Sequence, residues 1–283
     1  MTKKIKILLA ICAAILVALL AWSIWENKHL VLTEYTIQNP EIPTAFDGFR
    51  IAQVSDLHNE EFGENNERLI AMLRSAQPDI IAITGDLIDS RTTNIAVTLE
   101  FARQAMEIAP CYYVPGNHES RLEEYGQLFD DLAALGVTVL EDTSVTLQRD
   151  GQSIYLLGVL DPSFKTDYVL TWEAKTMEES LIPIFREEGF TILLSHRPKF
   201  LDLYVKYKVD LVLSGHNHGG QVRLPFVGGL YSPDEGFFPE YDAGFLEREN
   251  TQMIISRGIG DSVIPLRINN PPEVVLITLT PNP

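Results

Sequence analysis

Histidine, aspartate and asparagine residues recur at one kind of position in this sequence, directly after short apolar runs. Five of the six histidines lie there. Imidazole, carboxylate and amide groups are common ligands of divalent metal ions, and histidine also moves protons near neutral pH. The residues concerned are Asp56, His58, Asp86, Asn117, His118, His196, His216 and His218. If the fold brings them together, they can hold metal ions and support hydrolysis.

The apolar runs before these residues have the pattern of β-strands. They cover residues 51–54, 80–83, 112–115, 192–194 and 211–213. Ligands of open α/β sheets bind outside the carboxyl ends of the strands, so we expect the five segments to deliver their polar side chains to one edge. Gly85, Gly116 and Gly215 would let the backbone come close to an ion.

Each motif taken alone has an ordinary structural explanation. Asp56-x-His58 is typical of a solvated turn, Gly116 to Glu119 of a tight turn before a helix, and a single His196 of a hydrogen-bonded buried histidine. The run from Gly215 to His218 is more specific, because alternate residues at a strand end point the same way. Five such motifs after five strand-like runs favour one shared metal site.

Together the motifs carry a family resemblance. The set Asp56-x-His58, Gly85-Asp86, Gly116-Asn117-His118-Glu119, His196 and Gly215-His216-x-His218 resembles the calcineurin-like metallophosphoesterases, closely over residues 50–223. Residues 256–260 and 271–279 are similar to the C-terminal end of a bacterial membrane-anchored branch of predicted phosphodiesterases. The resemblance implies an α/β fold built as a four-layer α/β/β/α sandwich.

The resemblance also implies two divalent metal ions, Mn²⁺, Fe²⁺ or Zn²⁺. One ion would take Asp56, His58, Asp86 and His218, and the other Asp86, Asn117, His196 and His216, with Asp86 as the bridge. Two cations about 3.5–4 Å apart can hold a shared hydroxide as nucleophile and bind phosphoryl oxygens. Catalysis would rest on Asn117 and on His118, which matches the family histidine that protonates the leaving oxygen or stabilises the transition state. The alternative is that His118 only orients a ligand.

Three further candidates keep two interpretations each. Asp89 orients a ligand histidine or begins a helix. Arg257 binds phosphate or forms a surface ion pair. The run from Asp234 to Tyr241, with Phe237 and Phe238, edges the substrate pocket or packs under a loop.

The N-terminus has the pattern of a membrane anchor. Residues 7–25 are an uncharged run of 19, long enough to span a bilayer, after Lys3, Lys4 and Lys6. Basic residues before the run predict that this end stays in the cytoplasm and that the catalytic part lies outside it. We therefore divide the chain into an anchor, residues 1–29, and a metallophosphoesterase domain, residues 30–283. A cleaved signal peptide and a buried core helix are the alternatives.

Composition excludes several classes of protein. The 283 residues are 46% hydrophobic, and 22 Lys and Arg against 39 Asp and Glu give a net charge of −17. This acidity argues against a nucleic-acid partner. The two cysteines, Cys12 and Cys111, form no disulfide framework, since Cys12 lies in the apolar run.

Apolar periodicity locates the helices and strands around the motifs. It predicts helices over residues 64–76 and 95–106, and a third from a capping box at Ser120 to Gly136. Asp150-Gly151 predicts a hairpin between residues 145–149 and 152–156. Residues 253–257 and 274–279 are expected to be strands.

The sequence thus favours a two-metal phosphodiesterase that hydrolyses a small or lipid-linked phosphodiester. Its substrate would be a small molecule or a lipid headgroup at the membrane. One alternative is a pyrophosphate hydrolase of the UDP-2,3-diacylglucosamine type, although a catalytic domain outside the cytoplasm disfavours a cytosolic substrate. The other is a catalytically silent protein that uses the fold to bind a partner.

Overall fold

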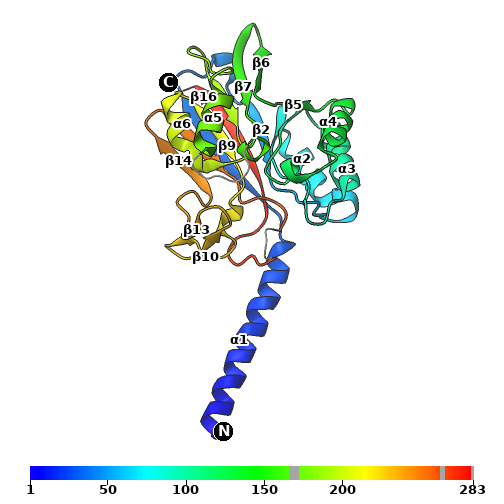
Figure 1. Cartoon of the computed structure of the whole chain (residues 1–283), viewed down its shortest axis with the longest axis vertical. Helices are drawn as coiled ribbons and strands as arrows, with labels where there is room; N and C mark the ends of the chain where they lie inside the picture. The colour runs from blue at the N-terminus through cyan, green and yellow to red at the C-terminus, as the bar shows by residue number, and fades with distance from the viewer. Residues whose placement is uncertain (166–171, 262–264, 282–283) are drawn as a thin grey trace.

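A long N-terminal helix, α1 (Lys3–Asn27), projects from the rest of the chain and carries the N-terminus at its far end (Figure 1). The structure, a computed structural model, describes residues 1–165, 172–261 and 265–281. Among these residues α1 alone is long and apolar enough to cross a membrane, and only 6% of its most apolar window is buried. The alternative of a buried core helix is therefore wrong.

Two six-stranded sheets pack face to face. The first has the order β1-β16-β2-β3-β4-β5, and the second has the order β14-β15-β9-β8-β7-β6. The first contains β1 (Val31–Asn39), β16 (Glu273–Pro281), β2 (Arg50–Val54), β3 (Ile80–Thr84), β4 (Cys111–Val114) and β5 (Thr138–Val139). The second contains β14 (Gly244–Arg248), β15 (Thr251–Ile255), β9 (Leu211–Ser214), β8 (Thr191–Leu194), β7 (Gln152–Gly158) and β6 (Thr143–Arg149).

Helices cover the outer face of each sheet, so the body has four layers, α/β/β/α, as the family resemblance implies (Figure 1). The first sheet is covered by α2 (Glu67–Ala76), α3 (Ile95–Met106) and α4 (Tyr125–Ala134). The second is covered by α5 (Glu173–Leu181) and α6 (Leu201–Lys206).

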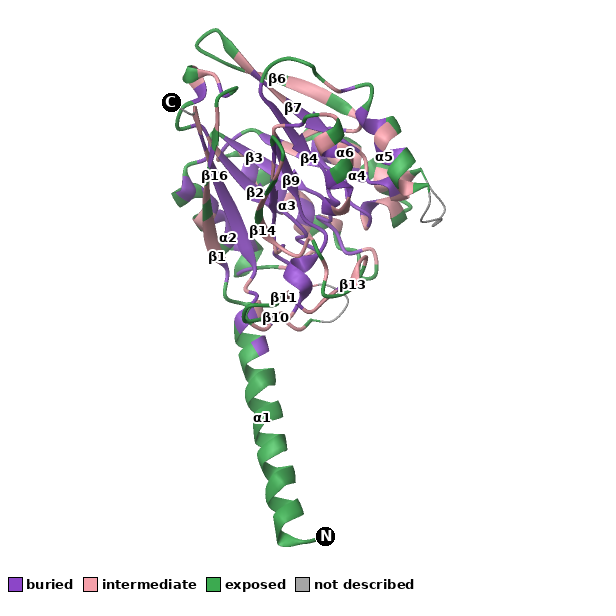
Figure 2. Cartoon of the chain, turned by 90° about the vertical axis from the view of Figure 1, so that its left-hand side faces the viewer, coloured by how far each residue is buried: buried purple, intermediate pink, exposed green. Residues whose placement is uncertain are grey.

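Period-two alternation in the strands builds the layers. In β8, Ile192 and Leu194 face the other sheet, whereas Leu193 packs against the helices. Both faces are buried, which explains why these strands are apolar runs rather than alternating ones. Figure 2 shows the buried strands in purple between partly exposed helices.

Several local predictions are confirmed. The helices predicted over 64–76 and 95–106 correspond to a short 3₁₀ turn with α2 and to α3. The hairpin is β6–β7, with Asp150 and Gly151 at positive φ angles of 49° and 77°, as an Asp-Gly turn requires. Cys111 is buried, and both cysteines are free.

The prediction that a capping box at Ser120 begins the third helix is wrong. The Ser120 hydroxyl donates to the Asn117 carbonyl within a 3₁₀ turn, η3 (Glu119–Arg121), and α4 begins only at Tyr125. Glu119, next to the expected cap, is buried in the loop that follows β4. The prediction failed because tertiary contacts of this loop compete with the helix start.

Short strands fill the segment between β9 and β14. A 3₁₀ turn, η6 (His218–Gly220), leads into two two-stranded sheets. They are β10 (Arg223–Leu224) with β11 (Gly228–Gly229), and β12 (Tyr231–Ser232) with β13 (Gly236–Phe237). They lie at the end of the body from which α1 emerges (Figures 1 and 2).

Candidate metal centre

The eight predicted site residues lie at five strand ends, as the order of the motifs predicts. β2, β3 and β4 run parallel in one sheet, and β8 and β9 run parallel in the other, so each group of carboxyl ends shares an edge. Hydrogen bonds join the two edges: Gln53 Nε2 donates to the Ser214 carbonyl at 2.8 Å, and His196 Nδ1 lies 2.8 Å from the Thr84 carbonyl. The structure therefore brings all eight residues together.

A first group of possible ligands contains Asp56, His58 and His218. One ligand atom from each lies within 4.8 Å of the others, and all three residues are buried. His58 Nε2 is 3.2 Å from His218 Nε2, and His218 Nε2 is 3.4 Å from Asp56 Oδ1. Three donors from the loops after β2 and β9 thus surround one point.

A second group contains Asp86, His196 and His216, with Asn117 beside it. His196 Nε2 is 3.2 Å from Asp86 Oδ2, 3.3 Å from Asn117 Oδ1 and 3.1 Å from His216 Nδ1. Asp86 Oδ2 is also 3.7 Å from His58 Nε2 in the first group. The same carboxylate oxygen therefore lies between the two groups.

The donor spacing fits metal ions. Two neighbouring nitrogen ligands that each lie 2.0–2.1 Å from one ion in tetrahedral or octahedral geometry are about 2.8–3.4 Å apart. The pairs His58–His218 and His196–His216 have nitrogen separations of 3.2 and 3.1 Å. Mixed imidazole, carboxylate and amide donors without a thiolate suit Mn²⁺, Fe²⁺ or Zn²⁺. The residues present can therefore hold two such ions.

The backbone of the site is unusual. Left-handed φ angles occur at five of the seven possible ligands, namely Asp56, His58, Asp86, His216 and His218. Such conformations are costly for residues other than glycine and cluster where the surrounding structure enforces them for function. The strand-end loops thus aim these side chains inward.

Two glycines leave room for the carboxylates. A Cβ at Gly116 would lie 2.2 Å from Asp86 Oδ1, and a Cβ at Gly215 would lie 2.3 Å from Asp56 Oδ2. Neither glycine has a positive φ. These positions require glycine because of close approach rather than turn geometry.

Contacts around the site fix its side chains. The Thr84 carbonyl accepts from Nδ1 of His196, which leaves Nε2 to face the site. The buried Glu119 carboxylate accepts from the backbone N–H groups of Gly116, Asp86 and Ile88. Glu119 therefore holds the β3 and β4 loops together, a role that its place in the Gly116–Glu119 motif does not reveal.

Electrostatics of the ion-free site follow from burial and close charges. Burial raises the pKa of Asp56 to about 6 and lowers the pKa of His58 to about 3. Burial also acts on Asp86 and His196, but their mutual attraction outweighs it, so the pKa of Asp86 falls and that of His196 rises to about 10. In the ion-free site, His196 therefore carries positive charge beside Asp86, whereas burial keeps His58 neutral.

His118 differs from the other histidines of the site. The backbone N–H of Ser90 donates to its Nδ1 at 3.1 Å, and Asp89 Oδ1 lies 3.5 Å from the same atom. Since Nδ1 accepts, the hydrogen of the neutral ring is on Nε2. His118 also forms a possible three-residue metal group with His58 and Asp86. It lies at the edge of the centre and is only half-buried.

The structure decides between the interpretations of two other candidates. Arg257 is paired with Glu273 and Thr33, so its charge is used within the fold. Asp89 begins no helix: it binds Arg91 and lies beside His118. A helix start at Asp89 and a phosphate-binding Arg257 are both disfavoured.

Sequence reasoning missed a buried charge cluster beside His196. Arg197 contacts Asp161 at 2.7 Å and Asp234 at 3.2 Å. Asp234 Oδ2 lies 2.7 Å from Lys199 Nζ and 3.5 Å from His216 Nε2. In the sequence, Asp234 is distinguished only as the first residue of an aromatic run. No spacing signal connects residues 161, 197 and 234, because the contact arises from the folding of separate loops.

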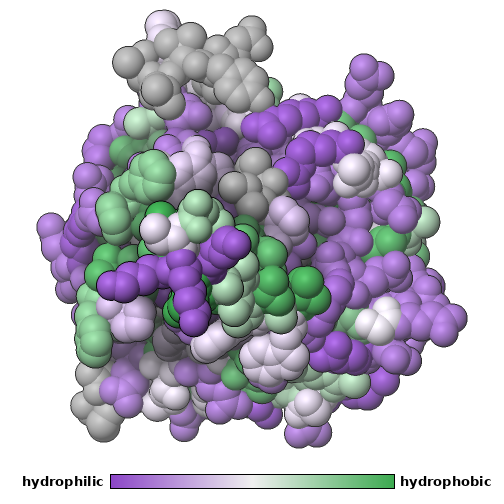
Figure 3. Space-filling model, turned by 90° about the horizontal axis from the view of Figure 1, so that it is seen from below, coloured by the Kyte–Doolittle hydropathy of each residue, from purple (hydrophilic) through white to green (hydrophobic). Residues whose placement is uncertain are grey.

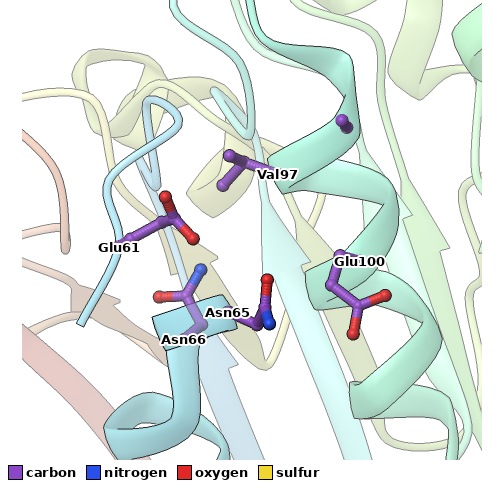
Figure 4. A pocket seen from close by; sticks show the side chains of 6 residues that line it. Glu61, Asn65, Asn66, Val97 and Glu100 are labelled. Carbon is purple, nitrogen blue, oxygen red and sulfur yellow. The ribbon is translucent and has the colours of Figure 1, made fainter. Parts of the chain in front are cut away.

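A separate polar cavity of about 560 Å³ lies away from these residues, between the segment before α2 and the start of α3 (Figure 4). It is lined by Glu61, Asn65, Asn66, Ala96, Val97 and Glu100. Its polar side chains serve the protein itself: Asn66 caps the Phe62 N–H, and Glu100 binds Arg103. This cavity is not part of the metal centre.

The chain matches the calcineurin-like phosphoesterase family over residues 49–220. It therefore belongs to this family of phosphoester hydrolases. The matched region contains all eight site residues. The four-layer fold and the paired donor groups agree with that membership.

Relatives span most of the chain. The metallophosphoesterase YkuE of Bacillus subtilis is 32% identical over 90% of this chain and 87% of its own length. The Escherichia coli phosphodiesterase YaeI is 27% identical over 82% of both chains. The crystal structure of TT1561 from Thermus thermophilus aligns with a TM-score of 0.53 at 14% identity, over 75% of this chain and 90% of that one. This last similarity shows the fold alone.

Proposed function

We propose that the chain is a two-metal phosphodiesterase, held to a membrane by α1, that hydrolyses a small or lipid-linked phosphodiester. The observation that carries the proposal is the position of Asp86 Oδ2, which lies 3.2 Å from His196 Nε2 and 3.7 Å from His58 Nε2. A single carboxylate between two donor groups can contact both ions of a pair that lie about 3.5–4 Å apart.

The ligand assignment follows the two donor groups. Asp56, His58, Asp86 and His218 would hold one ion, and Asp86, Asn117, His196 and His216 the other. When bound, such ions lower the pKa of water and neutralise charge on phosphoryl oxygens. Asn117 would place its amide beside the second ion, and the Thr84 carbonyl and Glu119 would keep the ligands in position.

His118 would act on the substrate rather than on an ion. Its Nδ1 already accepts from Ser90, so the Nε2 hydrogen is free to bind a phosphoryl or leaving-group oxygen. A neutral ring with this tautomer favours stabilisation of the transition-state charge by a hydrogen bond.

The acidic charge of the chain bears on the substrate. A net charge of −17 repels polyanions at long range, while two dications attract phosphate locally. A small or headgroup-sized phosphodiester is therefore favoured over nucleic acid. The name of the YaeI relative supports a diester.

The membrane topology is part of the proposal. Lys3, Lys4 and Lys6 precede the apolar segment and favour an N-terminus in the cytoplasm. The catalytic domain would then lie outside the cytoplasm. Hydrogen bonds between the end of α1 and the body favour an anchor that is kept over a signal that is removed.

The experiment is a hydrolysis assay of the full chain in detergent, with bis-p-nitrophenyl phosphate and p-nitrophenyl phosphate as substrates. Each is tested with Mn²⁺, Fe²⁺, Zn²⁺ or a chelator. We expect faster turnover of the diester and loss of turnover with chelator. Faster turnover of the monoester would overturn the diester assignment.

Asp86→Asn is the decisive variant, because it removes the shared charge between the donor groups. We expect a loss of kcat/KM of about 1,000-fold or more together with a lower metal content. Asp130→Asn, on the exposed face of α4, is the matched control and should leave both unchanged. Full activity of Asp86→Asn would contradict a two-metal mechanism.

A further inference from the structure

The C-terminal end of α1 is fastened to the catalytic body. The Glu26 carboxylate accepts from Trp22 Nε1 at 2.7 Å and from the backbone N–H groups of Asn269 and Asn270 at 2.8 Å each. Ser23 Oγ accepts from the Arg267 N–H at 3.1 Å. Ser23 and Glu26 are the buried residues of a helix that is otherwise almost entirely exposed. The helix end is therefore held against the body by specific contacts.

The same segment supports the metal centre. Asn270 Nδ2 donates to the His218 carbonyl at 2.7 Å and to the Gln221 carbonyl at 3.1 Å. Asn269 Nδ2 donates to the Arg223 carbonyl at 3.2 Å. Two successive asparagines thus connect the end of α1 with the loop that carries His218 and with the strand that follows it.

The ribbon, defined as residues 221–238 with β10 to β13, exposes large apolar side chains. Among the described residues outside the N-terminal helix and Met1, eight large hydrophobic residues are exposed, and five of them belong to the ribbon. These five are Leu224, Phe226, Val227, Phe237 and Phe238. Such a concentration on one element marks an interaction surface.

The ribbon faces the same way as the helix that leaves the body. Both cartoon views place β10 and β13 at the end of the body from which α1 emerges (Figures 1 and 2). Seen from the side of α1, hydrophobic side chains gather toward the centre of the view, and hydrophilic side chains dominate the edge (Figure 3). A bilayer that holds α1 would therefore lie against this face.

An apolar cavity of about 300 Å³ lies at the ribbon, and the nearest of its lining residues to the metal centre along the chain is Gly220, two positions after His218. It is lined by Gly220, Gln221, Val222, Leu230, Tyr231, Phe237 and Leu266. Gly220 belongs to η6 with His218, and Leu266 precedes Arg267, whose N–H binds Ser23. Its volume lies in the range of small-molecule sites.

The ribbon has no basic cluster that would attract it to anionic lipids. Arg223, the basic residue of the ribbon, is paired with Asp242 at 3.1 Å. A ribbon without a free cluster of Lys or Arg is not built for electrostatic attraction to anionic lipids. Its contact with a membrane would be hydrophobic and insensitive to salt.

We infer that the ribbon rests in the interfacial layer of the bilayer that holds α1, and that the apolar cavity binds the hydrocarbon part of a lipid-borne phosphoester. This inference rests on the proposed function and narrows its substrate to esters carried by the membrane. The fixed end of α1 sets the metal centre at the headgroup level, where the phosphate of such a lipid lies.

The first test measures the surroundings of the ribbon without any catalysis. An environment-sensitive nitrobenzoxadiazole probe is attached to Phe226→Cys in a Cys12→Ala chain reconstituted in dioleoylphosphatidylcholine nanodiscs. We expect blue-shifted emission that is quenched by lipid-borne nitroxides and unchanged by salt. The same probe at Ile182→Cys, another exposed position on the far layer, should report water. A water-like signal at position 226 would overturn the inference.

The second test compares hexadecyl p-nitrophenyl phosphate with methyl p-nitrophenyl phosphate, two diesters with one leaving group, in the same nanodiscs. We expect the hexadecyl ester to have the higher kcat/KM, and Phe226→Ser/Phe237→Ser/Phe238→Ser to lower the ratio of the two values about tenfold. Trp172→Ser/Ile182→Ser should leave the ratio unchanged.

The outcomes separate this inference from the proposed function. Equal kcat/KM for the two esters in the unaltered chain would overturn the lipid-binding cavity and leave the two-metal chemistry standing. Hydrolysis of neither ester with any ion would overturn the proposed function, while the probe at position 226 would still decide whether the ribbon lies in the membrane.

Discussion

The strand ends of the metal centre and the ribbon beside them are neighbours in the chain and in space, but they are held in different ways. At the strand ends, Glu119 accepts three backbone N–H groups and the Thr84 carbonyl fixes His196. The ribbon has two two-stranded sheets and five exposed apolar side chains. Polar loops that are fixed by hydrogen bonds can hold metal ions in a defined geometry, whereas an exposed apolar element can contact a bilayer. On the proposed function, the strand ends would carry the chemistry and the ribbon would contact the substrate.

After Asp86→Asn, the largest effect is expected where the strand ends leave no space. In Gly116→Ala the new Cβ would lie 2.2 Å from Asp86 Oδ1, so the shared carboxylate must move. A displacement of about 1 Å at a reacting centre lowers activity about 100-fold. We expect a loss of that size in kcat/KM, with the protein still folded by circular dichroism.

Gly126→Ala is the matched control, because nothing lies within 4 Å of its Cβ position in α4. It should keep full activity and stabilise the helix by about 0.5–1 kcal/mol. Equal activity of the two alanine variants would show that the strand ends are less tightly built than the comparison requires.

A smaller effect is expected at Asp234, which joins the two regions. Its carboxylate lies 3.5 Å from His216 Nε2, and contacts with His216, Arg197 and Lys199 outweigh burial and lower its pKa. Asp234→Asn should weaken metal binding about 10- to 100-fold, as loss of a carboxylate behind a ligand histidine does. A chelator-competition titration measures this affinity.

Added metal distinguishes positioning from folding in this variant. Activity of Asp234→Asn should recover as the ion concentration rises. Asp202→Asn, an exposed carboxylate paired with Arg248, should bind metal like the unaltered chain. If Asp234→Asn kept its metal affinity but stayed less active at every ion concentration, Asp234 would have no role in supporting the metal centre.

The smallest catalytic effect is expected at the end of α1. Glu26→Ala leaves the N–H groups of Trp22, Asn269 and Asn270 without their acceptor, so the free energy of unfolding should fall by about 1–3 kcal/mol. Denaturant titration in detergent measures this change. The kcat/KM for the methyl ester should change by less than about twofold.

Glu179→Ala, on the exposed side of α5, is the control for this substitution and should keep the stability of the chain. A catalytic loss in Glu26→Ala as large as in Gly116→Ala would contradict this difference between the two regions, because the metal centre would then depend on the anchor rather than on its own loops.

The α/β class and the convergence of the donor residues were predictable from the sequence for a physical reason, whereas the four-layer arrangement came from the family resemblance. Strands buried on both faces are apolar runs, and the polar residues that end them stand out. The helical periodicity of residues 95–106 and the Asp150-Gly151 turn are local signals, and both elements are present. The ligand roles of the converging residues remain a prediction.

Other features depend on contacts between distant segments. β1 mixes polar and apolar residues and became a strand because β16, more than 240 positions later, pairs with it. Ser120 has the pattern of a cap, but its hydroxyl binds Asn117 instead. The Asp161–Arg197–Asp234 contacts and the position of the ribbon beside α1 have no local signature. Such features follow from tertiary structure rather than from motifs.

The most direct test of the two-metal centre is an anomalous diffraction measurement on crystals of the full chain grown with Mn²⁺. Two peaks about 3.5–4 Å apart are expected on either side of Asp86. One should lie among Asp56, His58 and His218, and the other among Asn117, His196 and His216. A single peak, or two peaks that Asp86 does not touch, would contradict the bridging role of this carboxylate.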